Sequence, residues 1–207
     1  MKNCLKFSLA IFFMVAFTDI HAQIKPGYIF GLNLSTLTLK TKGISSNPKT
    51  LVGIHYGGCY DIPLPANFTL QPGLLFSAKG SDYKIDTVEY SISPIYIEVS
   101  TLAIYTFGSG MVKISLFCGP YFACGVGGYK IEPGGALKNI TFGSKEKNDL
   151  KPFDVGINSG AAINIKGLAI SVQYGIGLAN ISPVTTTVLE MKNKVIGISI
   201  SSSFAGK

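Results

Sequence analysis

Apolar and polar residues alternate with a period of two along most of this chain. In residues 167–182, "GLAISVQYGIGLANIS", one parity is mostly large and apolar and the other is small or polar. The large side chains of this stretch belong to Leu168, Ile170, Val172, Tyr174, Ile176 and Leu178. Because successive side chains of a β-strand point to opposite sides, the alternation predicts a strand whose two faces meet different surroundings.

Eight segments carry this alternation. We expect strands near residues 26–35, 51–62, 67–80, 93–107, 111–127, 152–165, 168–180 and 194–204. The connections between them alternate between long and short in chain order, beginning and ending with a long one. Tight turns at one end and longer loops at the other are typical of outer-membrane barrels, whose short turns face the periplasm.

The parity of the segments indicates which face points inward. Residues 152–165 set Phe153 and Val155 against Asp154 and Gly156, and the other segments follow the same rule. The lumen of an eight-stranded barrel is narrow and suits small or polar side chains, so the large apolar parity is expected to face lipid. The sequence therefore predicts an all-β fold, an eight-stranded antiparallel up-and-down transmembrane β-barrel. A soluble exported binding barrel of lipocalin type, with the apolar parity inside, is the alternative.

Composition supports the membrane alternative. Hydrophobic residues make up 47% of the chain and charged residues 14%, and the mean hydropathy is +0.37. These values are too apolar for a typical soluble protein of this length. Beyond the N-terminus there is no run of about 18 apolar residues, which argues against a helical membrane protein.

The N-terminus has the features of a secretory signal peptide. Lys2 and Lys6 precede an apolar stretch from Phe7 to Phe17, and the small residue Ala22 precedes Gln23. Such a segment is removed during export. We therefore expect residues 1–22 to be a signal peptide and residues 23–207 to be the barrel domain.

Neither a nucleic-acid partner nor a catalytic, cofactor or metal site is expected. The formal net charge is +7, but every basic residue is lysine and the lysines are dispersed, whereas nucleic-acid contacts favour arginine. His55 is the only histidine after residue 22, and Cys59 lies too far along the same strand to share a metal with it. No G-x-S-x-G motif occurs. The enzymatic alternative is a membrane-embedded lipid-modifying enzyme.

Several charged residues fall on the lumen parity. Lys79, Glu98 and Lys113 come from the third, fourth and fifth expected strands, at depths that we expect to be comparable. Asp61 and Asp154 are expected to join them. Unpaired charges in the lumen would be costly, so we expect a salt-bridged network that closes the lumen, with an ion path as the alternative.

The long connections supply the candidate interaction surface. Residues 36–50 and 129–151 are both rich in lysine and belong to the same end of the barrel. The candidate contact residues are Lys40, Lys42, Lys145 and Lys147. Positive outer loops would attract anionic lipopolysaccharide or an acidic partner through salt-sensitive contacts. The alternative is a solvated loop without a ligand.

An ordered series of strand patterns resembles a known family. The patterns are "GLNLST", "GIHYGGCYDIPLPANFTLQPGLLFSAKG", "SPIYIEVSTLAIYTF", "CGPYFACGVGG", "FDVGINSGAAI" and "QYGIGLANIS". Together they look like the PorT-like outer-membrane β-barrel proteins of Bacteroidota, over residues 23–207. The resemblance implies an eight-stranded barrel in the outer membrane of a Gram-negative bacterium. It also implies outer-membrane lipid, lipopolysaccharide and other envelope or secretion proteins as partners, and an accessory role in protein secretion or envelope integrity.

Overall fold

The computed structural model describes residues 24–40, 47–85, 88–132, 134–184 and 190–203. The predicted signal peptide, residues 1–22, lies outside the described residues. Within the described residues, no helix has the length and apolar character that crossing a membrane requires.

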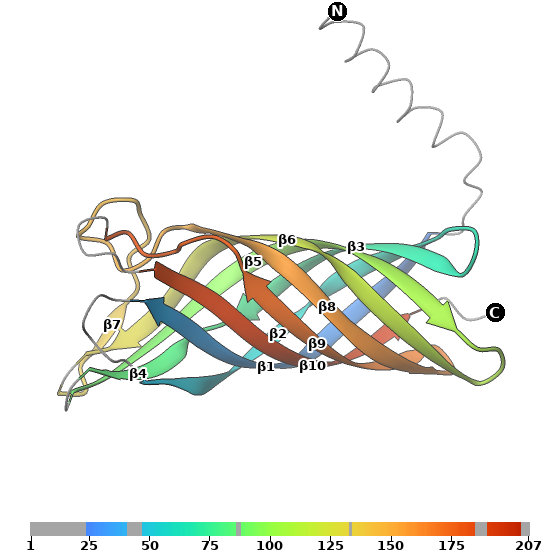
Figure 1. The fold of residues 1–207 in the computed structure, drawn as a ribbon, viewed down its shortest axis with the longest axis horizontal. Helices are drawn as coiled ribbons and strands as arrows, with labels where there is room; N and C mark the ends of the chain where they lie inside the picture. The colour runs from blue at the N-terminus through green and yellow to red at the C-terminus, as the bar shows by residue number, and fades with distance from the viewer. Residues whose placement is uncertain (1–23, 41–46, 86–87, 133, 185–189, 204–207) are drawn as a thin grey trace, which may run out of the picture.

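The described residues form ten β-strands (Figure 1). They are β1 (Lys25–Lys40), β2 (Asn47–Pro63), β3 (Phe68–Ala78), β4 (Ser81–Ile85), β5 (Val88–Phe107), β6 (Val112–Ile131), β7 (Leu137–Asn139), β8 (Phe153–Ile165), β9 (Leu168–Gly177) and β10 (Glu190–Ser203).

Eight of these strands close into a ring. The order around the ring is β1, β2, β3, β5, β6, β8, β9 and β10, and β10 pairs with β1 again. Every one of these pairings is antiparallel. β4 continues the position of β3 between β2 and β5, and β7 pairs with the end of β6. The predicted eight-stranded antiparallel up-and-down barrel is confirmed.

The two ends of the barrel differ in their connections. Residues 64–67, 108–111 and 166–167 form short turns at one end, which we call the turn end. The two-residue turn between β8 and β9 places Lys166 at φ 50° and Gly167 at φ 88°, as a tight hairpin requires. Gly27 pairs with Ser203, so the first and last strands also meet at the turn end. The long connections lie at the opposite end, the loop end (Figure 1).

Several strands extend further at the loop end than predicted, although β9 ends at Gly177 instead of residue 180. Residues 36–40 and 47–50, expected in a loop, belong to β1 and β2. Most of residues 81–92, also expected to be a loop, form the hairpin of β4 with β5. The prediction was wrong here because it identified strands by large apolar residues on the outward parity. A strand that extends beyond the lipid does not need such residues.

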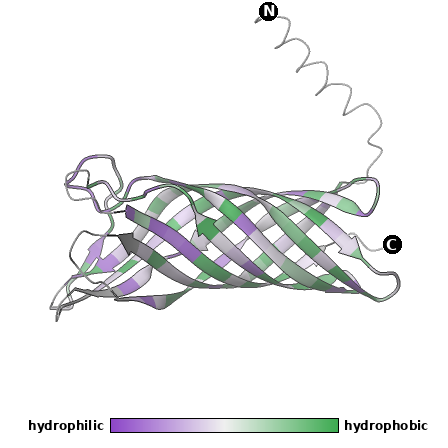
Figure 2. Cartoon of the chain, viewed as in Figure 1, coloured by the Kyte–Doolittle hydropathy of each residue, from purple (hydrophilic) through white to green (hydrophobic). Residues whose placement is uncertain are grey.

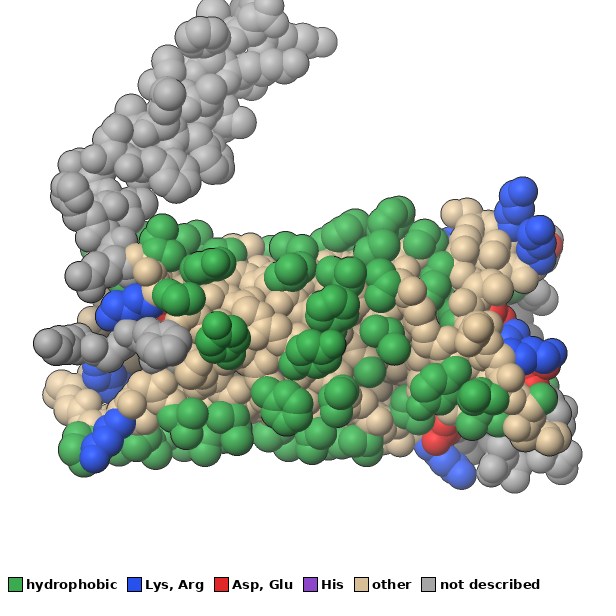
Figure 3. Space-filling model, turned by 180° about the vertical axis from the view of Figure 1, so that it is seen from behind, with side chains coloured by type: hydrophobic (Ala, Val, Ile, Leu, Met, Phe, Trp, Pro, Cys, Tyr) green, Lys and Arg blue, Asp and Glu red, His purple; other side chains and the backbone are tan. Residues whose placement is uncertain are grey.

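The outer surface is apolar and the lumen is not. Val172 is 52% exposed and its cross-strand partner Ile198 is 45% exposed, whereas Ala169 and Ser199, of the opposite parity on the same two strands, are buried. Apolar and polar residues alternate along each strand (Figure 2). Charged side chains gather towards the two ends and leave an apolar belt between them (Figure 3). An exposed belt of this kind is the surface that a β-barrel presents to lipid.

Replacing Val172 by lysine should therefore destabilise the barrel by about 2 to 4 kcal/mol in lipid, because the charge would enter hydrocarbon. Lysine at Ser144, an exposed position of the loop end, is the control and should change the stability by no more than about 0.5 kcal/mol. Urea titrations in lipid vesicles, followed by circular dichroism, measure both values. Equal tolerance of the two substitutions would contradict the membrane-facing assignment.

Candidate functional site in the barrel lumen

The lumen has three regions along the barrel axis. A cavity of about 750 Å³ occupies the half next to the short turns, and we call it the turn-end cavity. Next comes the central ion-pair cluster, formed by Lys79, Glu98 and Asp154. The third region, at the loop end, is an apolar cap. The cap consists of Leu37, Ile92, Ile140, Leu150, Ile181 and Met191, with Phe142 packed against it.

Glycines make room for the large side chains of the lumen. A Cβ at Gly156 would lie 2.5 Å from the ring of Tyr121. A Cβ at Gly31 would lie 2.6 Å from the ring of His55. Such distances are shorter than van der Waals contact, so the rings lie where they do because these positions carry no side chain. The small residues of the lumen parity therefore help to fix the geometry of the site.

Lys79 is the centre of the ion-pair cluster. Its Nζ lies 2.6 Å from Glu98 Oε2 and 3.8 Å from Asp154 Oδ2, and the Lys79 side chain is 4% exposed. The ammonium group also lies over the ring of Tyr121, 4.2 Å from the centroid, a favourable cation–π position. Glu98 of β5 and Asp154 of β8 thus meet a lysine from the segment between β3 and β4 at one buried point.

A break between β3 and β4 positions Lys79. Ala78 ends β3 and Ser81 begins β4, so Lys79 and Gly80 interrupt the ladder. Gly80 has φ 145°, and a Cβ there would lie 2.1 Å from the carbonyl oxygen of Ile92. Only glycine fits this close approach. The interruption leaves the side chain of Lys79 buried in the lumen while its backbone N–H donates to the carbonyl oxygen of Pro94 at 3.0 Å.

Neutral side chains donate to one oxygen of each carboxylate, and the buried Asp154 Oδ1 has no hydrogen-bond partner among the described residues. Tyr121 Oη donates to Asp154 Oδ2 at 3.0 Å, and Asn193 Nδ2 donates to the same oxygen at 2.9 Å. Asn158 Nδ2 donates to Glu98 Oε1 at 3.1 Å. Sequence reasoning missed these three residues. Tyr121 lies on β6, next to the strand of Asp154, whereas Asn158 and Asn193 reach partners on strands that are not neighbours, and residue 193 was expected in a loop.

Lys113 lies elsewhere, and the expectation that it shares the depth of Glu98 is wrong. Glu98 pairs with Ala123, whereas Lys113 pairs with Asn164 next to the turn end. Ten residues of β6 separate Lys113 from Ala123, about 33 Å along the strand. Lys113 lines the turn-end cavity. No ion pair or hydrogen bond joins it to another residue of the described ranges.

His55 is held between two polar side chains of the lumen. Its Nδ1 lies 2.8 Å from Asn33 Oδ1 and its Nε2 lies 2.7 Å from Ser199 Oγ. Asn33 Nδ2 in turn donates to Ser77 Oγ at 3.0 Å, which fixes the orientation of the amide. This hydroxyl–imidazole–amide chain has the connectivity of a nucleophile, a base and an orienting group. Ser199 is in β10, however, and β10 pairs with β1 on one side and with β9 on the other. The backbone N–H of Ser199 therefore takes part in strand pairing and is not free to bind an oxyanion.

Asp149 and Glu132 hold the loop-end segment between β6 and β8 in place through ion pairs and hydrogen bonds. Asp149 accepts from Lys130 Nζ at 2.6 Å and from the backbone N–H and the hydroxyl of Thr141, each at 2.8 Å. Burial raises the pKa of Asp149, but the hydrogen bonds from Lys130 and Thr141 outweigh burial and hold the pKa below its usual value. Glu132 lies 3.0 Å from Lys130 Nζ and also pairs with Lys138. The two acids are therefore engaged within the segment.

The candidate loop lysines lie at this end. Lys145 and Lys147 are exposed, and neither forms an ion pair with another residue in the part of the chain that the structure describes. Lys40 is the last residue of β1, opposite Glu190, and its side chain lies outside the described part. Lys42 lies outside the described residues.

Comparisons with known proteins agree with this architecture. The family model of the outer membrane protein beta-barrel domain matches residues 21–182. No curated protein matches the chain.

Solved structures of three bacterial surface proteins are similar in fold. Ail of Yersinia pestis, whose structure contains the heparin analogue sucrose octasulfate, is 10% identical, over 87% of this chain and 99% of that chain, with a TM-score of 0.47. Neisserial surface protein A is 12% identical, over 86% and 97%, with a TM-score of 0.45. OprG of Pseudomonas aeruginosa is 10% identical, over 87% and 94%, with a TM-score of 0.46. No binding or activity follows from similarity at this level.

The ion-pair cluster generates a stability prediction. Replacing Glu98 by glutamine should cost about 3 to 5 kcal/mol, because Lys79 would keep its charge in a buried site with only Asp154 at 3.8 Å. The control is Glu190→Gln, which removes a charge from the partly exposed pair with Lys192 and should cost less than about 1 kcal/mol. Urea unfolding in lipid vesicles measures both. Similar losses for the two variants would show that the buried pair does not support the barrel.

Proposed function

Because the chain belongs to the outer membrane protein beta-barrel domain family, we propose that it is a non-catalytic, non-conducting barrel whose loop end is an interaction surface. The barrel lies in the outer membrane of a Gram-negative bacterium. The short turns of such barrels face the periplasm and the longer loops face outwards, so the loop end is the outer end. The observation that carries the proposal is the contrast between a lumen that is closed at its centre and a loop end whose segments are held by ion pairs and hydrogen bonds.

The filling of the lumen supports the non-conducting part of the proposal. Lys79 bridges carboxylates from β5 and β8, and the rings of Tyr96 and Tyr121 lie beside its ammonium group. Leu37 and Leu150 in the apolar cap have no exposed surface. An ion would have to break a buried salt bridge and then cross an apolar layer, and both steps are costly.

The length of the strands supports an interaction surface beyond the membrane. β5 and β6 each span 20 residues, whereas crossing a membrane needs about 9 to 11 residues per strand. Several residues of each strand therefore project past the lipid. Backbone hydrogen bonds and the Lys130–Asp149 contact give this projecting part a defined shape. A defined surface binds a partner at a lower entropic cost than a flexible loop does.

The charges of the loop end support an anionic partner. Glu132 and Asp149 are engaged by Lys130, Lys138 and Thr141. Residues 129–151 carry five lysines against three acids, so this segment keeps a net positive charge, with Lys145 and Lys147 exposed on either side of Glu146. Lipopolysaccharide, or an acidic protein of the envelope, would be attracted to such a surface through screened contacts.

The ordered strand patterns support a place among the PorT-like barrels of Bacteroidota and an accessory role in protein secretion or envelope integrity. The enzymatic alternative, a membrane-embedded lipid-modifying enzyme, needs its reactive groups next to lipid. His55 is instead 4% exposed and lies in the lumen, with both ring nitrogens engaged by Asn33 and Ser199.

The loop lysines provide the test. The variant with Lys40, Lys42, Lys145 and Lys147 replaced by glutamine should bind lipopolysaccharide roughly tenfold more weakly at low salt, since each exposed contact contributes up to about 1 kcal/mol. The measurement is binding of the barrel, folded in nanodiscs free of lipopolysaccharide, at low and at high salt. High salt should abolish most of the difference.

The matched control removes charge at the other end of the barrel. Lys113→Gln with Lys166→Gln lowers the net charge at the turn end and should leave lipopolysaccharide binding unchanged. Binding that is equally strong in the loop variant, the control and the unmodified protein would contradict an anionic partner at the loop end.

A further inference from the structure

The turn-end cavity is a built site that the proposed interaction surface does not use. Its volume of about 750 Å³ falls in the range of small-molecule pockets, about 300 to 1,000 Å³. The short turns at residues 64–67, 108–111 and 166–167 contribute to its lining, so it opens towards the periplasm. Its inner end is closed by Lys79 and Glu98.

Positive charge exceeds negative charge near the mouth of this cavity. Lys113 and Lys166 both line it, against the carboxylate of Asp61, which accepts from Gln71 Nε2 at 2.7 Å. Lys113 has no ion-pair or hydrogen-bond partner among the described residues, whereas Lys79 is paired with Glu98. Lys113 pairs with Asn164 across the two strands, and Lys166 comes two residues after Asn164. Positions related in this way lie about 7 to 8 Å apart, within reach of two long side chains around one anion.

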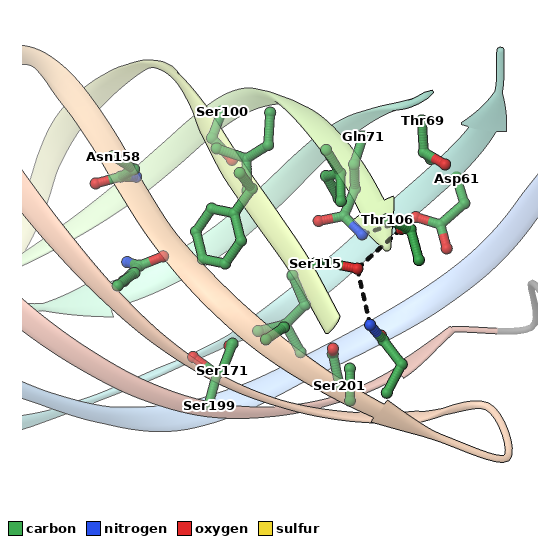
Figure 4. A pocket seen from close by; sticks show the side chains of 18 of the residues that line it. Asp61, Thr69, Gln71, Ser100, Thr106, Ser115, Asn158, Ser171, Ser199 and Ser201 are labelled. Atoms are coloured by element: carbon green, nitrogen blue, oxygen red, sulfur yellow. Dashed lines mark hydrogen bonds between the residues drawn. The ribbon is translucent and has the colours of Figure 1, made fainter. Parts of the chain in front are cut away.

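The wall of the cavity is polar near its mouth and apolar further in. Ser115 Oγ accepts from Asn164 Nδ2 at 2.8 Å and lies 2.8 Å from Thr106 Oγ1 (Figure 4). Two residues further along β6, Phe117 packs against Leu102 and Ala162, with Ile104 beside them. A ligand that matches this sequence of surfaces has an anionic head at the lysines and an apolar body against Phe117.

We propose that the turn-end cavity binds a small organic carboxylate with an apolar body, which enters from the periplasm. The lysines select an anion over an amine or an alcohol, because neither alternative supplies a counter-charge to Lys113 and the carboxylate of Asp61 already accepts from Gln71. The apolar wall selects an organic anion over inorganic phosphate, which has no surface to place against Phe117 and Leu102. The site lies at the opposite end from the loop lysines, so the proposal stands independently of lipopolysaccharide binding.

The experiment is a titration of the folded barrel in nanodiscs with 4-phenylbutyrate, followed by NMR of backbone amides. We expect saturable shifts at residues of the cavity, such as Ser115 and Phe117, and none at the loop end. Lys113→Gln should weaken the binding about tenfold, as the loss of one charge-assisted contact does. Lys138→Gln, with the same charge loss at the loop end, should leave the affinity unchanged.

A cavity-filling variant and two comparison ligands test the apolar wall and the charge separately. Ala162→Leu adds volume beside Phe117 and should also weaken binding, while heat-modifiable migration reports that each variant is folded. Uncharged 4-phenyl-1-butanol and inorganic phosphate should each bind at least about tenfold more weakly than 4-phenylbutyrate. Equal binding of the alcohol, an unchanged affinity in a folded Lys113→Gln variant, or the absence of saturable shifts in the cavity would overturn the proposal.

Discussion

Lipid outside a narrow barrel is the constraint on which the rest of this structure depends. Hydrocarbon offers no hydrogen bonds, so polar side chains of the spanning strands must point into the lumen. An eight-stranded cylinder leaves little space there, so the inward side chains are forced into contact. Glu98 and Asp154 therefore meet Lys79 rather than water. The closed centre of the lumen follows from the same parity that places Val172 in lipid.

The sequence predicted what depends on local periodicity and missed what depends on contacts across the lumen. Strand parity and the alternation of connection lengths were sufficient for the barrel, because both are read along the chain. The depth of Lys113 was also readable: it follows the turn at residues 108–111 closely, so it had to lie near the turn end. The bond from Asn193 on β10 to Asp154 on β8 was not readable, because it passes over the intervening β9 and because residue 193 was expected in a loop. The strands beyond the lipid were missed because no apolar parity marks them.

The two ends of the barrel are built for different tasks. At the loop end, Asp149 holds Lys130 and Thr141 together, and Leu150 is buried in the apolar cap, so the outer surface is shaped and sealed at once. At the turn end, Phe117 and Lys113 face an open cavity. The ion-pair cluster separates the two, so the proposed outer contact and the proposed periplasmic ligand would have no continuous path between them.

Conductance of the purified barrel in a planar lipid bilayer tests the closed lumen most directly. The account predicts no stable conductance steps at moderate voltage, because the Lys79–Glu98 pair and the apolar cap stand in series across the lumen. Long-lived open steps from the unmodified, folded protein, blocked by changes at Lys79 or Glu98, would contradict it and would make the charged cluster part of an ion path.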